Sequence, residues 1–232
     1  MGSGVKKNYF KQIKTIKLSK KVRGKHSMKR SGYKVFIRVF ALVVIMSLLL
    51  VGVSLYTSKD DLKKGKIVQH VFTKKVEQHR STVEKYAKEF EVEEHTDVLL
   101  AMMLQESGGR GDDPMQSSES LCGKVGCIND PEKSIKQGVS YFAEALHAAD
   151  GEIELAVQAY NFGIGFIYYL QKNDQNYSQD ATIKFSQEMY KNAKDPSIYT
   201  CLREEAKQYD ACYGDIFYAR DVMEYKQKFV AN

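Results

Sequence analysis

The chain has 232 residues, 43% of them hydrophobic, which is enough for one domain of moderate size with appendages. Its formal net charge of +6 hides an uneven distribution, because residues 1–38 hold 13 Lys or Arg and no acidic residue. Removing these from the 35 basic residues leaves 22 against 29 acidic ones, so residues 39–232 carry a net charge of −7. This part of the chain also has no basic, aromatic-rich pattern, which argues against a nucleic-acid partner.

Residues 39–56 form an uncharged apolar run of 18 residues behind the basic arm. This length is at the short end for a membrane span, and the positive-inside rule puts the N-terminus in the cytoplasm. A cleaved secretory signal is the alternative, but the basic region is long and no small-x-small site follows. The arm could also bind anionic lipid or DNA. We therefore expect a single-pass protein of the cell membrane with four parts: a basic cytoplasmic arm (1–38), a transmembrane signal-anchor (39–56), a helical stalk or packing helix (57–92) and an exported catalytic domain (93–232).

Beyond residue 56, apolar side chains recur at helical intervals, and no stretch alternates with the period of two that is typical of strands. Residues 57–92 are charged and contain no proline, which predicts an amphipathic helix. Residues 107–130 are rich in glycine and serine and are predicted to form a long loop. Further helices are predicted at 98–106, 131–146, 153–160, 166–170, 183–190 and 218–229. The fold class is therefore predicted to be all-α.

Glu106 is the first candidate catalytic residue. It follows the apolar run 99–104 and precedes Gly108-Gly109, where glycine can end a helix. Apolar neighbours and the negative end of the helix dipole both raise the pKa of a carboxyl in this position. A glutamic acid that stays protonated near neutral pH is the general acid of glycosidases. The alternative is a helix-end glutamate that points into water.

A second candidate site lies at residues 159–165, Ala-Tyr-Asn-Phe-Gly-Ile-Gly. Gly163 and Gly165 allow the backbone to approach a ligand closely, and Tyr160 and Asn161 supply hydrogen-bonding groups. A plain helix C-cap is the alternative interpretation of this segment.

Four cysteines lie on the predicted exported side, which allows three disulfide pairings. We favour the local pairs, Cys122 with Cys127 and Cys201 with Cys212. Zinc is the alternative, but the spacing is not Cys-x2-Cys and no histidine stands nearby. No metal or other cofactor is expected.

These motifs together resemble those of the goose-type lysozyme and lytic transglycosylase superfamily. The resemblance rests on Glu106-Ser107, on Met115-Gln116-Ser117 and on the Ala-Tyr-Asn-x-Gly-x-Gly segment at 159–165. The wider pattern, with residues 105–109, 113–120 and Tyr213-Gly-Asp215, is similar to the Gram-positive lysozyme-like branch. That branch includes muramidase domains of wall hydrolases on conjugative elements. The resemblance covers roughly residues 75–230.

The resemblance implies a lysozyme-like fold that cleaves the β-1,4 bond between N-acetylmuramic acid and N-acetylglucosamine in peptidoglycan glycan strands. Glu106 would be the general acid, and Gln116 and Ser117 would line the cleft beside it. Tyr160 and Asn161, with Gly163, would orient the acid or bind the acetamido sugar. It further suggests a secretion or conjugation apparatus as a partner. The two cysteine pairs are departures from the general pattern.

The second carboxylate of a two-carboxylate hydrolase is left open by the sequence. Glu119, Asp113 and Asp112 are all available, and Glu119 is our first choice because it lies in the matched segment. If none of them faces Glu106, a lytic transglycosylase that forms an anhydro product becomes the better interpretation. A non-catalytic peptidoglycan-binding scaffold is the alternative of a different class.

Overall fold

The computed structural model describes residues 36–40, 42–50 and 70–230. The chain divides into two compact units, Met1–Asp61 and Leu62–Asn232. In the first unit, residues 36–40 and 42–50 are helical. No helix among the described residues is both long and apolar enough to cross a membrane. The predicted anchor at 39–56 lies partly outside the described residues and stays a prediction, as does the arm before it.

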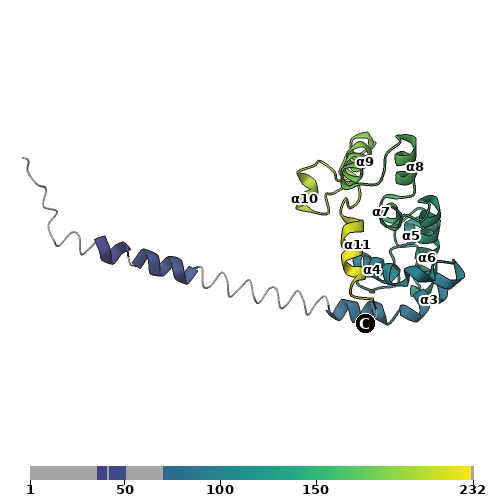
Figure 1. The fold of residues 1–232 in the computed structure, drawn as a ribbon, viewed down its shortest axis with the longest axis horizontal. Helices are drawn as coiled ribbons and strands as arrows, with labels where there is room; N and C mark the ends of the chain where they lie inside the picture. The colour runs from purple at the N-terminus through teal and green to yellow at the C-terminus, as the bar shows by residue number, and fades with distance from the viewer. Residues whose placement is uncertain (1–35, 41, 51–69, 231–232) are drawn as a thin grey trace, which may run out of the picture. The chain divides into compact units, whose positions relative to one another are not determined.

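The described part of the second unit consists of helices joined by turns and loops, without a strand (Figure 1). This agrees with the all-α prediction. A helical stretch at 70–77 comes first. The elements that follow are α3 (Arg80–Glu89), η1 (Glu93–His95), α4 (Thr96–Glu106), α5 (Ser118–Cys122), α6 (Pro131–Ala148), α7 (Ile153–Phe162), α8 (Gly165–Lys172), α9 (Gln179–Asn192), η2 (Pro196–Ile198), α10 (Glu204–Lys207) and α11 (Tyr218–Lys226).

Helix α4 forms the centre of the core. Its side chains from Val98 to Leu104 are all buried, so it has no solvent-facing stripe. Helices α3 and α11 pack against it, and α7 packs between α6 and α11. The helix ends where Gly108 and Gly109 adopt positive φ angles of 65° and 70°. Glu106 therefore lies at the C-terminal end of a buried helix, next to the loop that connects α4 to α5.

Two elements differ from the sequence-based expectation. The first part of the helix predicted over 57–92, residues 57–69, lies outside the described residues. From residue 70 on, the helix is interrupted by a turn at Gln78 and His79, and the part after the turn, α3, buries Val83 and Tyr86 in the domain. The predicted loop at 107–130 contains the short helix α5, because the carboxylate of Asp113 accepts hydrogen bonds from the backbone N–H groups that begin this helix. In contrast, the predicted helix start at Asp130-Pro131 is confirmed, with Asp130 as the N-cap.

Gly138 in α6 allows the loop that carries Met115 to approach the helix closely. A Cβ atom at this position would lie 2.7 Å from Met115 Cβ and 2.9 Å from the Tyr160 hydroxyl. Both partners are buried against the helix, so neither has free space into which it can move. A glycine is therefore required here by packing, although it stands inside a helix.

Gly138→Ala is expected to lower the free energy of unfolding by about 1 to 2 kcal/mol, because overpacking outweighs the better helix propensity of alanine. Gly165→Ala in α8 is the matched control, since nothing lies within 4 Å of its Cβ position. Urea unfolding of both variants tests this. Equal stability of the two variants would contradict the packing argument.

Candidate active site

Glu106 lies at the end of α4 and is half-buried. Its Oε1 accepts a hydrogen bond from the hydroxyl of Tyr218 at 2.6 Å. Burial raises the pKa of Glu106, the hydrogen bond from Tyr218 lowers it, and the nearby charges of Asp113 and Asp215 raise it; together these causes bring the pKa to about 7. A carboxyl with this pKa holds a proton in a large fraction of molecules at neutral pH and can act as a general acid.

Tyr218, the partner of Glu106, is fully buried in α11. Burial and the adjacent Glu106 raise the pKa of Tyr218 well above its usual value, so the phenol remains a neutral donor. The pairing of Tyr218 with Glu106 is not predicted from the sequence, because the two residues lie 112 positions apart. Only the packing of α11 on α4 brings the two side chains together, and no local motif indicates it.

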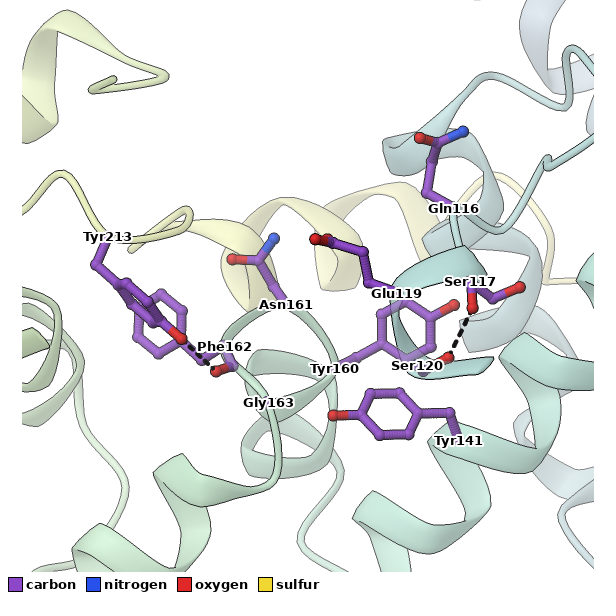
Figure 2. Close-up of a pocket in the computed structure, with 10 residues that line it drawn as sticks. All are labelled: Gln116, Ser117, Glu119, Ser120, Tyr141, Tyr160, Asn161, Phe162, Gly163 and Tyr213. Carbon is purple, nitrogen blue, oxygen red and sulfur yellow. Dashed lines mark hydrogen bonds between the residues drawn. The ribbon is translucent and has the colours of Figure 1, made fainter. Parts of the chain in front are cut away.

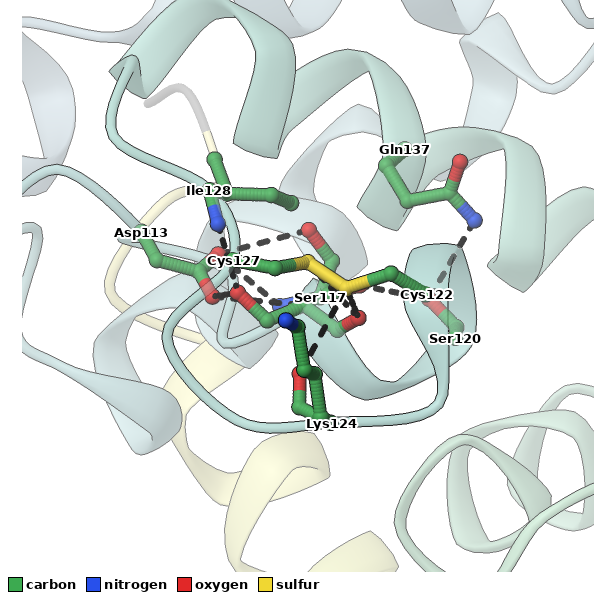
Figure 3. The surroundings of a disulfide bond; sticks show 9 residues. Asp113, Ser117, Ser120, Cys122, Lys124, Cys127, Ile128 and Gln137 are labelled. Carbon is green, nitrogen blue, oxygen red and sulfur yellow. Dashed lines mark hydrogen bonds between the residues drawn. A yellow bond between two sulfur atoms is a disulfide. The ribbon is translucent and has the colours of Figure 1, made fainter.

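Asp113 organises the loop between α4 and α5 (Figure 3). Its carboxylate accepts hydrogen bonds from the Ser134 and Ser118 hydroxyls, each at 2.6 Å, and from the backbone N–H groups of Ser117 and Ser118. Burial alone would raise the pKa of Asp113, but these hydrogen bonds outweigh it and lower the pKa. Its oxygens are therefore occupied in holding the loop, which removes it as a candidate base.

The segment 115–117 places one exposed side chain between two buried ones. Met115 and Ser117 are buried, and the Ser117 hydroxyl donates to the Ser134 carbonyl at 2.9 Å. Gln116 adopts a φ of +48°, an unfavourable value for a residue with a side chain, and is exposed. Such strain is typical of positions that the surrounding structure fixes for a function.

Tyr160 anchors the loop that carries Met115. Its hydroxyl donates to the Met115 carbonyl at 2.8 Å, and its role toward Glu106 or a sugar stays a prediction. Asn161 likewise uses its Oδ1 to accept a hydrogen bond from the backbone N–H of Asp215 at 2.7 Å. Both residues hold backbone segments that border the cleft.

Two adjoining cavities form this cleft. One, of about 450 Å³, contains Glu106, and the other, of about 270 Å³, extends toward Gly163 and Tyr213 (Figure 2). Four residues line both of them: Gln116, Glu119, Tyr160 and Asn161. Ser117 and Gly163 line only the second cavity. The structure therefore brings the predicted site residues to one continuous cleft, with Glu106 at one end.

Glu119 is the carboxyl that shares the cavity with Glu106 and is not occupied in holding the loop. It is exposed on α5, and no hydrogen bond to its carboxyl group is present among the described residues. Figure 2 shows its carboxyl group and the side-chain amide of Asn161 extending toward each other from opposite sides of the cleft. Asp112 lines neither cavity. Of the three carboxyls left open by the sequence, Glu119 alone is both in the cleft and accessible.

The segment 213–219 is held in place by α7 and by Arg203. Gln158 donates to the Asp215 carbonyl and accepts from the Ala219 N–H, and it is completely buried. Arg203 binds Asp215 at 2.6 Å and Asp221 at 2.6 Å. This network fixes the beginning of α11, and with it the position of Tyr218.

Gly214 explains why the Tyr-Gly-Asp pattern needs its glycine. The residue has a φ of 62°, and a Cβ atom there would lie 2.7 Å from the Phe162 ring and 2.8 Å from Asn161 Oδ1. A side chain would therefore separate Asn161 from the Asp215 N–H.

The four cysteines form two disulfides, Cys122–Cys127 and Cys201–Cys212. These are the local pairs favoured by the sequence analysis, and they leave no thiolate for zinc.

Residues 73–226 match the family model described as lysozyme-like. The chain belongs to the lysozyme-like family. It is 32% identical over 194 residues to the membrane protein YocA of Bacillus subtilis, covering 82% of this chain and 84% of YocA. It is 43% identical over 111 residues to the bifunctional muramidase/DL-endopeptidase CwlT of the same organism, covering 48% of this chain but only 34% of CwlT. The chain therefore matches about a third of the length of CwlT.

A solved structure gives a similar result. A Staphylococcus aureus protein, described as similar to a lipoprotein of the NLP/P60 family, aligns with a TM-score of 0.57 at 35% identity, over 65% of this chain and 52% of that one. The resemblance inferred from the motifs is thus confirmed at the level of the family.

Glu106→Gln is expected to become more stable than the wild type as the pH rises from 4.5 to about 7. The pKa of Glu106 is about 7 in the folded wild type and 4.5 in the unfolded chain, so between these pH values the folded wild type binds more protons than the unfolded one. The wild type therefore loses stability as the pH rises through this range. The glutamine retains the acceptor for Tyr218 but does not titrate. The difference between the two proteins should grow by up to about 3 kcal/mol across this range in urea unfolding.

Asp113→Asn is the control of opposite sign. The pKa of Asp113 is lowered, so its contribution is present above its usual pKa of 3.8 and is lost as the pH falls further. Asp113→Asn should therefore be less stable than the wild type above pH 3.8, and the difference in the free energy of unfolding should become smaller only below that pH. If the difference in the free energy of unfolding between Glu106→Gln and the wild type did not change with pH, this would contradict the raised pKa of Glu106.

Proposed function

We propose that the chain is a muramidase that hydrolyses the β-1,4 bond between N-acetylmuramic acid and N-acetylglucosamine in peptidoglycan, with Glu106 as general acid. The observation that carries the proposal is the half-buried Glu106, whose pKa is raised to about 7, at the wall of the cleft. Membership of the lysozyme-like family and the name of the relative CwlT support the same chemistry and substrate.

The hydrogen bond from Tyr218 occupies Oε1 of Glu106, which leaves Oε2 to carry the transferable proton. Proton transfer to the glycosidic oxygen breaks its bond to the anomeric carbon of the muramic acid. The departing sugar leaves with a hydroxyl group, and positive charge develops on the ring that remains. The negative charge left on Glu106 then favours this cationic ring.

Glu119 is the group that we assign to the second step. It projects into the same cavity as Glu106, and as a base it would take a proton from the water that attacks the anomeric carbon. Asp113 cannot serve because its oxygens are occupied by four hydrogen-bond donors.

A lytic transglycosylase is the second candidate, and one observation favours it. Glu106 is held by Tyr218, whereas Glu119 is exposed and has no hydrogen bond that fixes its carboxyl group among the described residues. In this reaction the 6-hydroxyl of the muramic acid attacks the anomeric carbon, Glu106 takes the proton back from that hydroxyl, and a 1,6-anhydro product forms. No second carboxylate is then required.

For the location, we propose that residues 39–56 anchor the chain and that the lysozyme-like domain faces the cell wall. The uncharged run behind 13 basic residues supports this, as does the description of YocA as a membrane protein.

Mass analysis of the muropeptides that the full-length chain releases from purified wall is the direct test. The wild type is expected to yield products with muramic acid at the reducing end. Glu106→Gln should lose activity by a factor of about 10² to 10⁴, the usual contribution of a general acid. Anhydro products would instead assign the chain to the transglycosylases. If the folded wild type bound purified wall but released no muropeptides, the chain would instead be a non-catalytic peptidoglycan-binding scaffold.

Glu119→Gln separates the two reactions independently of the product masses. A hydrolase that uses Glu119 as base should lose a similar factor of about 10² to 10⁴, because the attacking water is no longer activated. Asp112→Asn is the control, since Asp112 is exposed and outside both cavities, and it should retain wild-type turnover.

Tyr218→Phe is expected to move the alkaline limb of the activity profile above pH 7. The hydrogen bond from Tyr218 lowers the pKa of Glu106, so its loss lets burial raise that pKa further. Turnover should also fall by about tenfold, because the carboxyl is no longer held by a hydrogen bond worth about 1.5 kcal/mol. The matched control is Tyr225→Phe on the same helix. An unchanged limb in Tyr218→Phe would contradict the role of this hydrogen bond.

A further inference from the structure

Residues 70–79, which directly precede α3, pack on the domain with one apolar face, and we call them the leading segment. The segment is helical over residues 70–77. Val76 is completely buried, and Phe72 is partly buried against the core. Val71, one position before Phe72, is 56% exposed. This spacing is that of a helix with its apolar side chains on the side of the domain.

The apolar face of the leading segment lies against the turn that ends α4. A Cβ atom at Gly108 would lie 3.0 Å from Cγ of Phe72, and one at Gly109 would lie 3.0 Å from the backbone of Val76. The guanidinium of Arg110 lies over the Phe72 ring, 4.7 Å from its centroid. The two glycines therefore permit a close contact that a side chain at either position would push apart.

Ser107 connects the same turn to the catalytic cleft. It directly follows Glu106, and its hydroxyl donates to the Pro114 carbonyl at 2.8 Å and accepts from the Arg110 N–H at 3.1 Å. A displacement of the two glycines would therefore move Ser107, and with it the end of α4 and the loop between α4 and α5.

The residue that follows the leading segment, Arg80, holds the opposite end of α4. Its Nη1 donates to the Asp97 carboxylate at 3.1 Å, and its Nη2 donates to the Phe229 carbonyl at 3.2 Å. Asp97 lies in the first turn of α4. Residues 72–80 therefore contact α4 at both ends and restrain its movement along its own axis, which is the movement that would shift Glu106 relative to Tyr218.

We propose that Phe72 and Val76 are positioning residues, which hold the end of α4 so that Glu106 stays buried beside Tyr218. The proposal rests on the proposed function, because it takes Glu106 as the general acid. Neither positioning residue lines the cavity that contains Glu106, so both act through the turn and not on the substrate. The catalytic unit then includes the leading segment, which the sequence analysis assigns to a stalk or packing helix.

A change in the pKa of Glu106 is the expected consequence of losing this contact. Burial is the largest cause of the raised pKa, and a loosened turn lets water reach the carboxyl, so the pKa falls. Substitution of Phe72 or Val76 leaves unchanged the titratable and charged groups that surround the acid or face the turn: Tyr218, Asp113, Asp215, Tyr160, Glu119, His79 and Arg110.

Muropeptide release by the full-length chain, measured as a function of pH, tests the proposal. Phe72→Ala is expected to lower kcat about tenfold, because a small displacement of a catalytic group has a large effect on turnover. The alkaline limb of its activity profile should move about one pH unit toward acid. KM should not change, since no residue of the cleft is altered. Val76→Ala should act in the same direction, and it replaces Phe72→Ala if circular dichroism shows that variant to be unfolded.

Phe72→Leu and Val71→Ala are the matched controls. Leucine also has Cβ, Cγ and Cδ1 atoms, the atoms of Phe72 that lie nearest to Gly108, so Phe72→Leu should restore the wild-type limb. Val71→Ala changes an exposed side chain of the same helix and should alter neither kcat nor the limb. A lower kcat with a wild-type limb in Phe72→Ala or Val76→Ala would reduce these residues to a structural role and overturn the proposal, as would wild-type activity.

Urea unfolding measures the pKa of Glu106 without catalysis. The stability difference between Phe72→Ala and the same variant carrying Glu106→Gln should stop changing about one pH unit lower than the difference measured in the wild-type background. This shift, together with a wild type that releases no muropeptides, would retain the positioning role and reject the enzyme. Muropeptide release without this shift would retain the muramidase and reject the positioning role.

Discussion

The hydrogen bond between Tyr218 and Glu106 is the interaction on which the site depends. It joins the beginning of α11 to the end of α4, two helices that pack together in the core. A carboxyl in this position is costly when it is charged, and one buried donor offsets only part of that cost. The balance between burial and this single hydrogen bond leaves the pKa of Glu106 at about 7. The network of Gln158, Arg203 and Asp215 therefore matters to the acid, because it holds the helix that supplies the donor.

The carboxyl of Asp113 lies only seven residues after that of Glu106 in the chain, but its pKa is shifted in the opposite direction. Its carboxylate receives two hydroxyl and two backbone donors, whereas Glu106 receives one phenol. The pKa of Asp113 is lowered and that of Glu106 is raised, so one group holds a loop while the other holds a proton. Such separation of two carboxyls by their environments is a general feature of acid–base sites. The loop must be rigid for this to work, since movement of Asp113 would change the charge that Glu106 experiences.

Local patterns predicted the parts of this structure that depend on local chemistry. The apolar run ending at Gly108-Gly109 gave α4 and its terminal Glu106, and Asp130-Pro131 marked the start of α6. The parts that arise from contacts between distant segments were missed. Tyr218 is identified only by the packing of α11 on α4, and Arg203 only by its ion pairs. Helix α5 was missed because the carboxylate that accepts from the backbone N–H groups at its start belongs to Asp113, which lies outside the usual capping position.

The two disulfides hold the side of the cleft that the hydrophobic core does not hold. The buried side of the cleft is held by the core, through Met115, Tyr160 and Gly138, so it needs no covalent bond. The outer side is made by short loops whose exposed aliphatic side chains have few apolar neighbours to hold them. A disulfide restrains such a loop by reducing the number of conformations available to the chain, without any burial of its side chains. Val125 and Leu202 can therefore stay exposed and still keep a defined position at the border of the cavity that contains Glu106.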